Sequence, residues 1–136
     1  MREQPEGAGL LWQARETLLR ELLASLPEER KYEGLMVAAA MAIAARELEH
    51  GDARRRHAHA LLAELQSDLA TTPADTKALG NTLDQGARRL AADIRAGRHD
   101  GDARVHSILY RLILDRLAEN NPKLLAARNL TPESPE

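Results

Sequence analysis

Apolar residues recur along the chain with the spacing of amphipathic helices. The i, i+3, i+4, i+7 pattern fits five segments, at about residues 8–26, 27–50, 53–70, 72–97 and 103–119. Turn signals separate them, among them Pro27 and, after the last segment, an Asn-Asn-Pro sequence at residues 120–122. The pattern predicts an all-α fold, an up-and-down bundle of about five helices.

The second segment contains an uncharged run, GLMVAAAMAIAA at residues 34–45. A helix that is apolar on every side is buried on most of them, and its alanines allow neighbouring helices to approach closely. We therefore expect an Ala-rich central second helix. The run is shorter than the roughly 20 residues that span a bilayer, so no membrane segment is predicted.

The length of 136 residues fits one domain with a single hydrophobic core. We expect a helical-bundle domain over residues 1–126 and a flexible tail over residues 127–136, where Leu130 is the one large apolar residue after Asn129. The core must consist of Leu, Ile and Ala, because Phe is absent and aromatic residues make up 2% of the chain. These residues favour helices.

Composition also limits the function. With 19 basic and 21 acidic residues the net charge is −2, which offers no general attraction for nucleic acid. The absence of cysteine excludes disulfides, thiolate catalysis and cysteine-ligated zinc. The first residues lack the apolar stretch of a secretory signal. A cytoplasmic location is expected.

The tetrapeptide GDAR occurs twice, at residues 51–54 and 101–104. Each copy lies between two apolar segments, where glycine can end one helix in the left-handed conformation and aspartate can cap the next. We expect a helix boundary at both places. Internal duplication is an alternative, although the flanking sequences share little.

Arg54, Arg55 and Arg56 would then occupy the first turn of the third helix, where the helix dipole disfavours cations. Together with backbone N–H groups they could bind an anion or an acidic partner. Alternating helix directions would bring both GDAR turns to the same end of the bundle, so Arg98 and Arg104 would extend this surface. The alternative is a solvated charged face.

No motif for catalysis or metal binding is present. Glu47 and His50 have the Glu-x-x-His spacing of di-iron bundles, but the chain holds no second copy. A Gly-rich phosphate loop, His-Glu-x-x-His and Gly-x-Ser-x-Gly are all absent. We predict that the chain is not an enzyme by itself and has no cofactor or bound metal.

Several stretches resemble a family of small bacterial helical proteins, most of them uncharacterised. They are LMVAAAMAIAARELEHGD at residues 35–52, IRAG at 94–97, RLAENNPKLL at 116–125 and the opening LLWQARETLLRELL at 10–23. The most specific positions are the pairs Arg46 with Glu47 and Asn121 with Pro122. The resemblance covers nearly the whole chain.

The resemblance implies an accessory role. Members of this family are encoded beside acyl-CoA dehydrogenases and kinases that resemble aminoglycoside phosphotransferases, and in levulinate breakdown one acts with the kinase of 4-hydroxyacyl-CoA. The resemblance therefore implies that this chain is a non-catalytic subunit of such a kinase in short-chain hydroxy and keto acid catabolism. ATP and the catalytic residues would belong to the kinase. The alternative is a stand-alone helical protein that binds acyl-CoA or a similar anionic ligand.

Arg46 and Glu47 end the second predicted helix, which alternation places at the GDAR end. They form part of a docking surface or, equally, structural salt bridges. The candidate interface or anion-binding residues are therefore Arg46, Glu47, Asp52, Arg54, Arg55, Arg56, Arg98 and Arg104.

Overall fold

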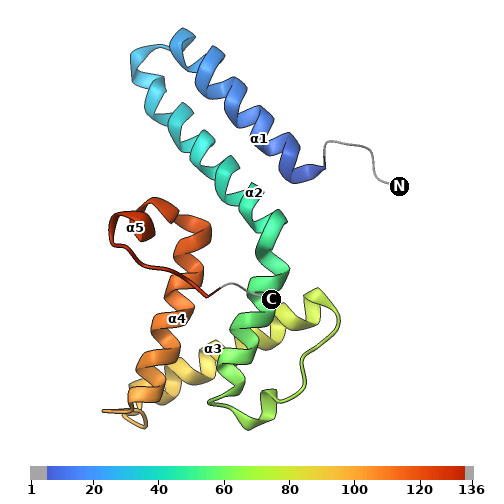
Figure 1. The fold of residues 1–136 in the computed structure, drawn as a ribbon, viewed down its shortest axis with the longest axis vertical. Helices are drawn as coiled ribbons and strands as arrows, with labels where there is room; N and C mark the ends of the chain where they lie inside the picture. The colour runs from blue at the N-terminus through green and yellow to red at the C-terminus, as the bar shows by residue number, and fades with distance from the viewer. Residues whose placement is uncertain (1–5, 134–136) are drawn as a thin grey trace. The chain divides into compact units, whose positions relative to one another are not determined.

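The computed structural model describes residues 6–133, and within this range the fold is all-α, as predicted. Figure 1 shows the five α-helices: α1 Gly7–Thr17, α2 Glu28–Ala63, α3 Thr76–Arg95, α4 Ala103–Asn120 and α5 Pro122–Ala127. The contacts divide the chain into two compact units, Met1–Gly51 (unit 1) and Asp52–Glu136 (unit 2). The long helix α2 contributes to both. The single-domain organisation stays a prediction.

Unit 1 is a helical hairpin. After α1 the chain continues through a π-helical segment, Leu18–Leu22, and a 3-10 turn, Leu23–Ser25, before Pro27 precedes α2. Helix α2 begins directly after Pro27, so the predicted boundary is confirmed. Proline suits the start of a helix. The π-helical segment adds a wider turn just before the chain reverses direction.

The two arms of unit 1 pack closely along small residues of α2. Ala38, Ala42 and Ala45 are 0–4% exposed. At Gly34 an added Cβ would lie 2.9 Å from methyl groups of both Leu23 and Leu26. This face of α2 therefore depends on the absence of larger side chains.

Polar contacts tie the arms together as well. Trp12 donates from Nε1 to Glu49 Oε1 at 2.8 Å, and Arg15 Nε donates to the carbonyl oxygen of Ala38 at 3.1 Å. The guanidinium carbons of Arg15 and Arg46 lie 6.0 and 5.8 Å from the centre of the Trp12 ring. Cation–π contacts therefore add to the aliphatic packing of α1 on α2.

The expectation that this part of α2 is buried on most sides is wrong. Tyr32 is 72% exposed and Met36 is 53% exposed. Ala39 and Ala40 are exposed as well, and Ile43 is half-buried. These five residues follow one another at helical spacing, so they form one stripe on the side of α2 away from Ala38 and Ala42. We call them the apolar stripe.

The first GDAR copy does not end a helix, so that prediction is wrong. Helix α2 passes through Gly51 and Asp52 without interruption. One glycine inside a helix costs only about 1 kcal/mol relative to alanine, and good helix formers surround it on both sides. Predicted helices two and three are therefore one helix, and the three arginines occupy no helix N-terminus.

The second copy behaves as predicted. Gly97 and Gly101 both have positive φ, at 74° and 75°, which few other residues adopt. Asp102 caps α4, because its side chain accepts a hydrogen bond from the Arg104 amide at 2.9 Å. Gly97 follows the C-cap of α3, so it ends that helix, whereas Gly101 of the GDAR copy lies in the turn before Asp102.

In unit 2 the core lies between the end of α2, α3 and α4. Its buried cluster consists of Leu62, Leu69, Leu90 and Val105. The predicted third helix ends early, at Ala63, and a turn brings Leu69 to this cluster. Gln66 stabilises the turn, because its side chain donates to the carbonyl oxygen of Gly86 at 2.9 Å. The absence of a side chain at Gly86 thus allows this turn to pack closely against α3.

Helix α3 begins at Thr76, with the side chain of Asp75 accepting from the Ala78 amide at 2.8 Å. The segment predicted from residue 72, with Thr72 as the cap, therefore becomes helical three residues later than expected. At the other end of the unit, Asn121 caps α5 by accepting from the Leu124 amide, and Pro122 occupies its first turn. These two family-motif residues thus form a helix start.

The predicted tail over residues 127–136 is described only to Glu133. In this part the Leu130 amide donates to the carbonyl oxygen of Leu125 at 2.9 Å. Residues 134–136 lie outside the described range. Among residues 6–133, no helix combines the length and apolar character that crossing a bilayer requires.

Two glycine substitutions test the packing of these helices. Gly34→Val should lower the free energy of unfolding by about 1–3 kcal/mol, because the new side chain overlaps two leucines. Gly80→Ala should raise it by about 0.5–1 kcal/mol, because no atom lies within 4 Å of the added Cβ and alanine favours the helix. Urea unfolding followed by circular dichroism measures both; equal effects would contradict the close approach at Gly34.

Candidate functional site

The arginines of the first GDAR copy bind neighbouring groups of unit 2. Arg56 Nε donates to Asp52 Oδ2 at 3.1 Å, one turn earlier in α2, and its Nη2 donates to the carbonyl oxygen of Ala74 at 3.3 Å. Thr76 Oγ1 donates to the other oxygen of Asp52 at 3.2 Å. The hydrogen bond from Arg56 is the main reason that the pKa of Asp52 lies below 3.8. These contacts hold the segment before α3 on α2.

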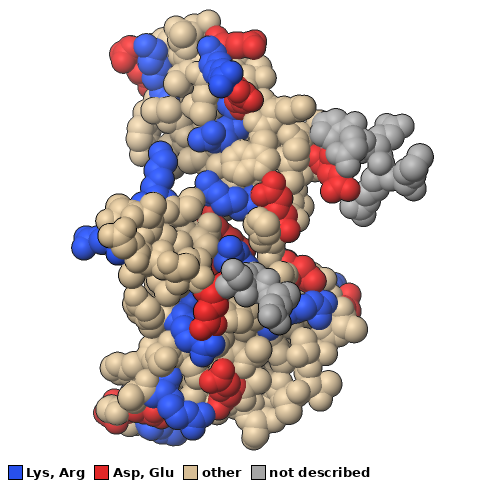
Figure 2. All heavy atoms as spheres, viewed as in Figure 1, with Lys and Arg blue, Asp and Glu red and all other residues tan. Residues whose placement is uncertain are grey.

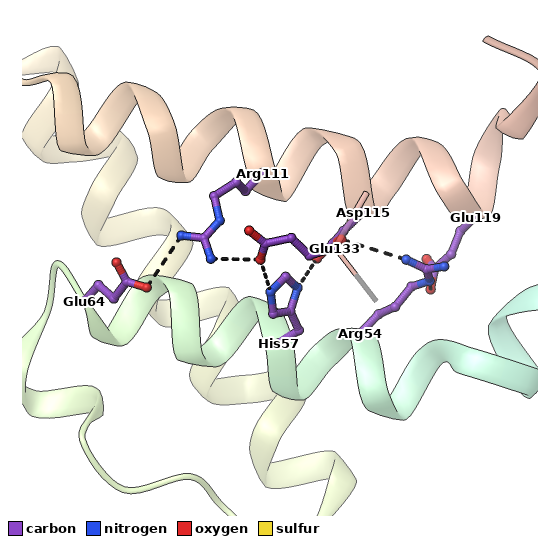
Figure 3. A network of polar contacts seen from close by, with 7 residues as sticks. All are labelled: Arg54, His57, Glu64, Arg111, Asp115, Glu119 and Glu133. Atoms are coloured by element: carbon purple, nitrogen blue, oxygen red, sulfur yellow. Dashed lines mark hydrogen bonds and ion pairs between the residues drawn. The ribbon is translucent and has the colours of Figure 1, made fainter. Parts of the chain in front are cut away.

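Arg54 points the other way, toward α4 (Figure 3). Its side chain is 16% exposed and forms ion pairs with Asp115 at 3.9 Å and with Glu119 at 3.7 Å. The Asp115 side chain is 7% exposed. A buried carboxylate needs such cationic partners, since desolvation costs several kcal/mol per ion.

His57 lies between two carboxylates. Its Nδ1 is 2.5 Å from Asp115 Oδ2 and its Nε2 is 2.8 Å from Glu133 Oε2 (Figure 3). Which ring nitrogen donates depends on the tautomer, because a neutral imidazole has one N–H donor and one acceptor nitrogen. The histidine thus joins α2, α4 and the segment after α5.

Arg111 completes this group, which we call the α2–α4 polar network. Arg111 Nη2 donates to Glu133 Oε2 at 2.8 Å, and its Nη1 is 3.7 Å from Glu64 Oε1. The hydrogen bond from Arg111, followed by that from His57, holds the pKa of Glu133 below 4.5. The same hydrogen bond raises the pKa of Arg111.

The network determines the relative direction of its helices. Arg54 lies beside Glu119 near the end of α4, whereas Arg104, at the start of α4, donates from Nη2 to the carbonyl oxygen of Glu64 at 2.6 Å. The end of α2 and α4 are therefore antiparallel, and the two GDAR copies lie at opposite ends of unit 2. The predicted common end is wrong, because it required the end of α2 and α4 to run parallel, and they run antiparallel.

The other sequence candidates have local partners. In unit 1, Arg46 stacks near Trp12 and Glu47 is exposed, and both have interaction partners. In unit 2, Arg98 Nη1 donates to Asp93 Oδ1 at 3.0 Å. Because the two GDAR copies lie at opposite ends of unit 2, Arg98 and Arg104 do not extend a surface formed by residues 54–56. A docking role for Arg46 and Glu47 stays a prediction. Among residues 6–133, no group of three or more His, Asp or Glu side chains is placed to hold a metal ion.

A groove opens on the core of unit 2. Its volume is about 410 Å³, and α3 supplies one wall through Gly80, Leu83, Ala87 and Ala91. The end of α2 and helix α4 supply the rest. Its charged lining residues are Arg55, Asp84 and Arg116. Arg55, one of the predicted anion-binding residues, therefore lies in a mainly apolar groove and has another interaction partner as well.

Surface charge gives no stronger candidate. On the face visible in Figure 2, basic and acidic side chains are interspersed in both units. The ion pairs of unit 1 follow the same pattern, with Arg20 bound to Glu16 at 3.0 Å and Arg30 bound to Glu33 at 2.7 Å. Such exposed pairs contribute little to stability.

Comparison with known families assigns the chain to a protein family. Residues 24–124 match the model of a domain of unknown function, DUF6285. The chain belongs to this family. Comparison with curated proteins and with solved structures gave no match for either.

The DUF6285 match includes most of the features described above. Within it lie the apolar stripe, the groove and the polar network up to Glu119, together with the family-motif pair Asn121 and Pro122. Glu133 lies after its end. The core of the network and the groove therefore lie within the family domain.

Sequence reasoning missed the network and the groove. The signal for the network is that Asp115 and Glu119 follow Ile108 and Leu112 at helical spacing, which puts carboxylates on an otherwise apolar face of α4. The signal for the groove is the small side chain of Ala87 on the apolar face of α3.

The carboxyl of Glu133 provides a test of the network. Because Arg111 stabilises its charged form, its titration by NMR should give a pKa below 4.5, and Arg111→Gln should move that pKa up toward 4.5. The stabilisation is therefore present above about pH 4.5 and is lost as the pH falls through the lower pKa of the folded state.

Arg89→Gln is the matched control. Arg89 pairs with Asp68 and lowers the pKa of that residue instead. The pKa of Glu133 should not change in this variant. A Glu133 carboxyl that titrates at the same pH in Arg111→Gln and in the unaltered chain would contradict the contact.

Proposed function

We propose that this DUF6285 chain is a non-catalytic accessory subunit of an aminoglycoside-phosphotransferase-like kinase that acts on 4-hydroxyacyl-CoA in short-chain hydroxy and keto acid catabolism. The family resemblance supplies the identity of the kinase. The observation that supports a binding role is the apolar stripe of unit 1. ATP and the catalytic residues would belong to the kinase.

The apolar stripe has the chemistry of a docking surface. Its two largest exposed members, Tyr32 and Met36, are of the types enriched in the centres of protein interfaces. Leu35 and Val37, which are 49% and 48% exposed, lie on either side of Met36. Contiguous exposed apolar surface of this kind marks interaction sites in water-exposed proteins, because burying it against a partner is favourable.

The small residues of the stripe favour a helix as the contacting element. Ala39 and Ala40 lie one turn after Met36, so only small side chains separate Met36 from Ile43 along the stripe. An apolar helix of the kinase could approach there as closely as α1 approaches Ala38 and Ala42 on the opposite side. The hairpin of unit 1 would then become a three-helix contact.

Co-expression with the kinase encoded beside the chain tests this proposal. The two proteins should co-elute on size exclusion, and the kinase should be more active in the complex than alone. Met36→Glu and Ala40→Glu should each weaken the complex by at least about tenfold, because each buries an unpaired charge in the contact. Both positions are exposed, so the helical signal in circular dichroism should not change.

Gln13→Glu is the matched control, since it adds the same charge at an exposed position of α1. The complex should tolerate it. A kinase that is equally active and elutes separately without the chain would refute the accessory role. Equal affinity of Met36→Glu and Gln13→Glu would refute the assignment of the surface.

The alternative prediction, a stand-alone protein that binds acyl-CoA, differs because it requires no kinase. The co-expression experiment separates the two, since a stand-alone protein forms no complex with the kinase.

A further inference from the structure

We propose that the groove of unit 2 is a binding site for an aliphatic chain that carries an anionic group near one end. This proposal goes beyond the proposed function, because the groove lies in unit 2 and the binding of a ligand there needs neither the kinase nor the apolar stripe.

The floor of the groove is hydrocarbon. Leu62 and Leu90 are 3% and 4% exposed and belong to the core cluster, while Leu83, Leu109 and Leu112 are partly buried around them. An aliphatic chain in the groove would therefore lie against the leucines of the core. Burying each methylene group of a ligand in such surroundings is favourable, because the group leaves water.

Small residues of α3 keep the groove open. Gly80, Ala87 and Ala91 line it at intervals of seven and four residues, so they lie on one face of the helix. At Gly80 the space around an added Cβ is empty to 4 Å. Leucine at any of these positions would continue the core outward and fill the space.

The charges of the groove favour an anion. Arg55 and Arg116 contribute two cationic groups and Asp84 one anionic group. Arg116 and Asp84 are exposed and Arg55 is half-buried, so the charges lie toward solvent while the leucines lie below. A guanidinium can bind a carboxylate or a phosphate through two parallel hydrogen bonds. A ligand that suits both layers has an apolar chain and an anionic end.

The dimensions suit a single chain. The volume of about 410 Å³ lies in the range of sites for small molecules. A second hollow of about 370 Å³ shares Ile94 and Leu109 with the groove and extends toward the turn at Gly101. A chain longer than the groove could continue into it. The anionic end could belong to a free fatty acid or to the phosphates of an acyl thioester.

Calorimetry on the purified full chain tests the site with three probes: decanoate, decanoyl-CoA and coenzyme A alone. Decanoate should bind with one-to-one stoichiometry. Ala91→Leu should weaken binding by at least about tenfold, because the side chain occupies the groove. Arg116→Gln should weaken it by about five- to tenfold through the lost charge.

Ala92→Leu is the matched control, because Ala92 is the next residue of α3, is exposed and does not line the groove. It should bind like the unaltered chain. Ala87→Leu offers a second blocking variant at an exposed groove position, should Ala91→Leu lose its helical signal.

Each outcome decides the question. Binding of decanoate that Ala91→Leu or Ala87→Leu abolishes supports a site for fatty acids. Binding of decanoyl-CoA alone, with the same sensitivity, supports a site for acyl thioesters. Binding of no probe, equal binding by Ala91→Leu and Ala92→Leu, or equal affinity for coenzyme A and decanoyl-CoA would overturn the proposal. A failed kinase complex would leave all these results unchanged.

Discussion

The continuity of α2 is the constraint on which unit 2 depends. Arg54 and His57 lie three residues apart on one face of this helix, so both side chains reach α4. A break there would have started a new helix with its own direction and its own cap. Instead, one helix provides both an apolar face for the core and a polar face for buried carboxylates. The energetic basis is a small difference, about 1 kcal/mol for one glycine against the propensity of many helix formers.

Polar and apolar interactions play separate roles in unit 2. The polar network fixes the relative direction and register of α2 and α4. If one helix moved by a turn along the other, Asp115 would lose its cationic partner while it is buried, which is unfavourable. The leucine cluster supplies most of the burial, but it is open on one side, where α3 presents small residues. A core that is closed on one side by ion pairs and open on the other can accept a ligand without disturbing the contacts that hold the helices.

The sequence predicted the all-α fold and most of the helical segments, because amphipathic spacing is a local property. The predicted number of five agrees only because two predicted helices form α2, while the short helix α5 was not predicted. The sequence also predicted the turn at Gly101, where two glycines and a capping aspartate act together. The prediction failed at Gly51, since the GDAR tetrapeptide does not show how strongly the residues on both sides of it favour one continuous helix. The pairing of Arg54 with Asp115 could not be predicted for the same reason, because it follows from the direction of helices and not from any motif. The exposure of Met36 was missed because the apolar character of a helix face does not show whether other parts of the same chain cover that face.

Trp12 gives unit 1 an optical signal of its own. It is the only tryptophan of the chain, it belongs to unit 1, and two guanidinium groups lie within 6.0 Å of its ring. Nearby cations alter the emission of an indole, so its fluorescence should change when the hairpin opens even if unit 2 is intact. The aromatic residue of unit 2 is Tyr110. The chain thus carries a built-in reporter that separates events in the hairpin from events in the rest of the fold.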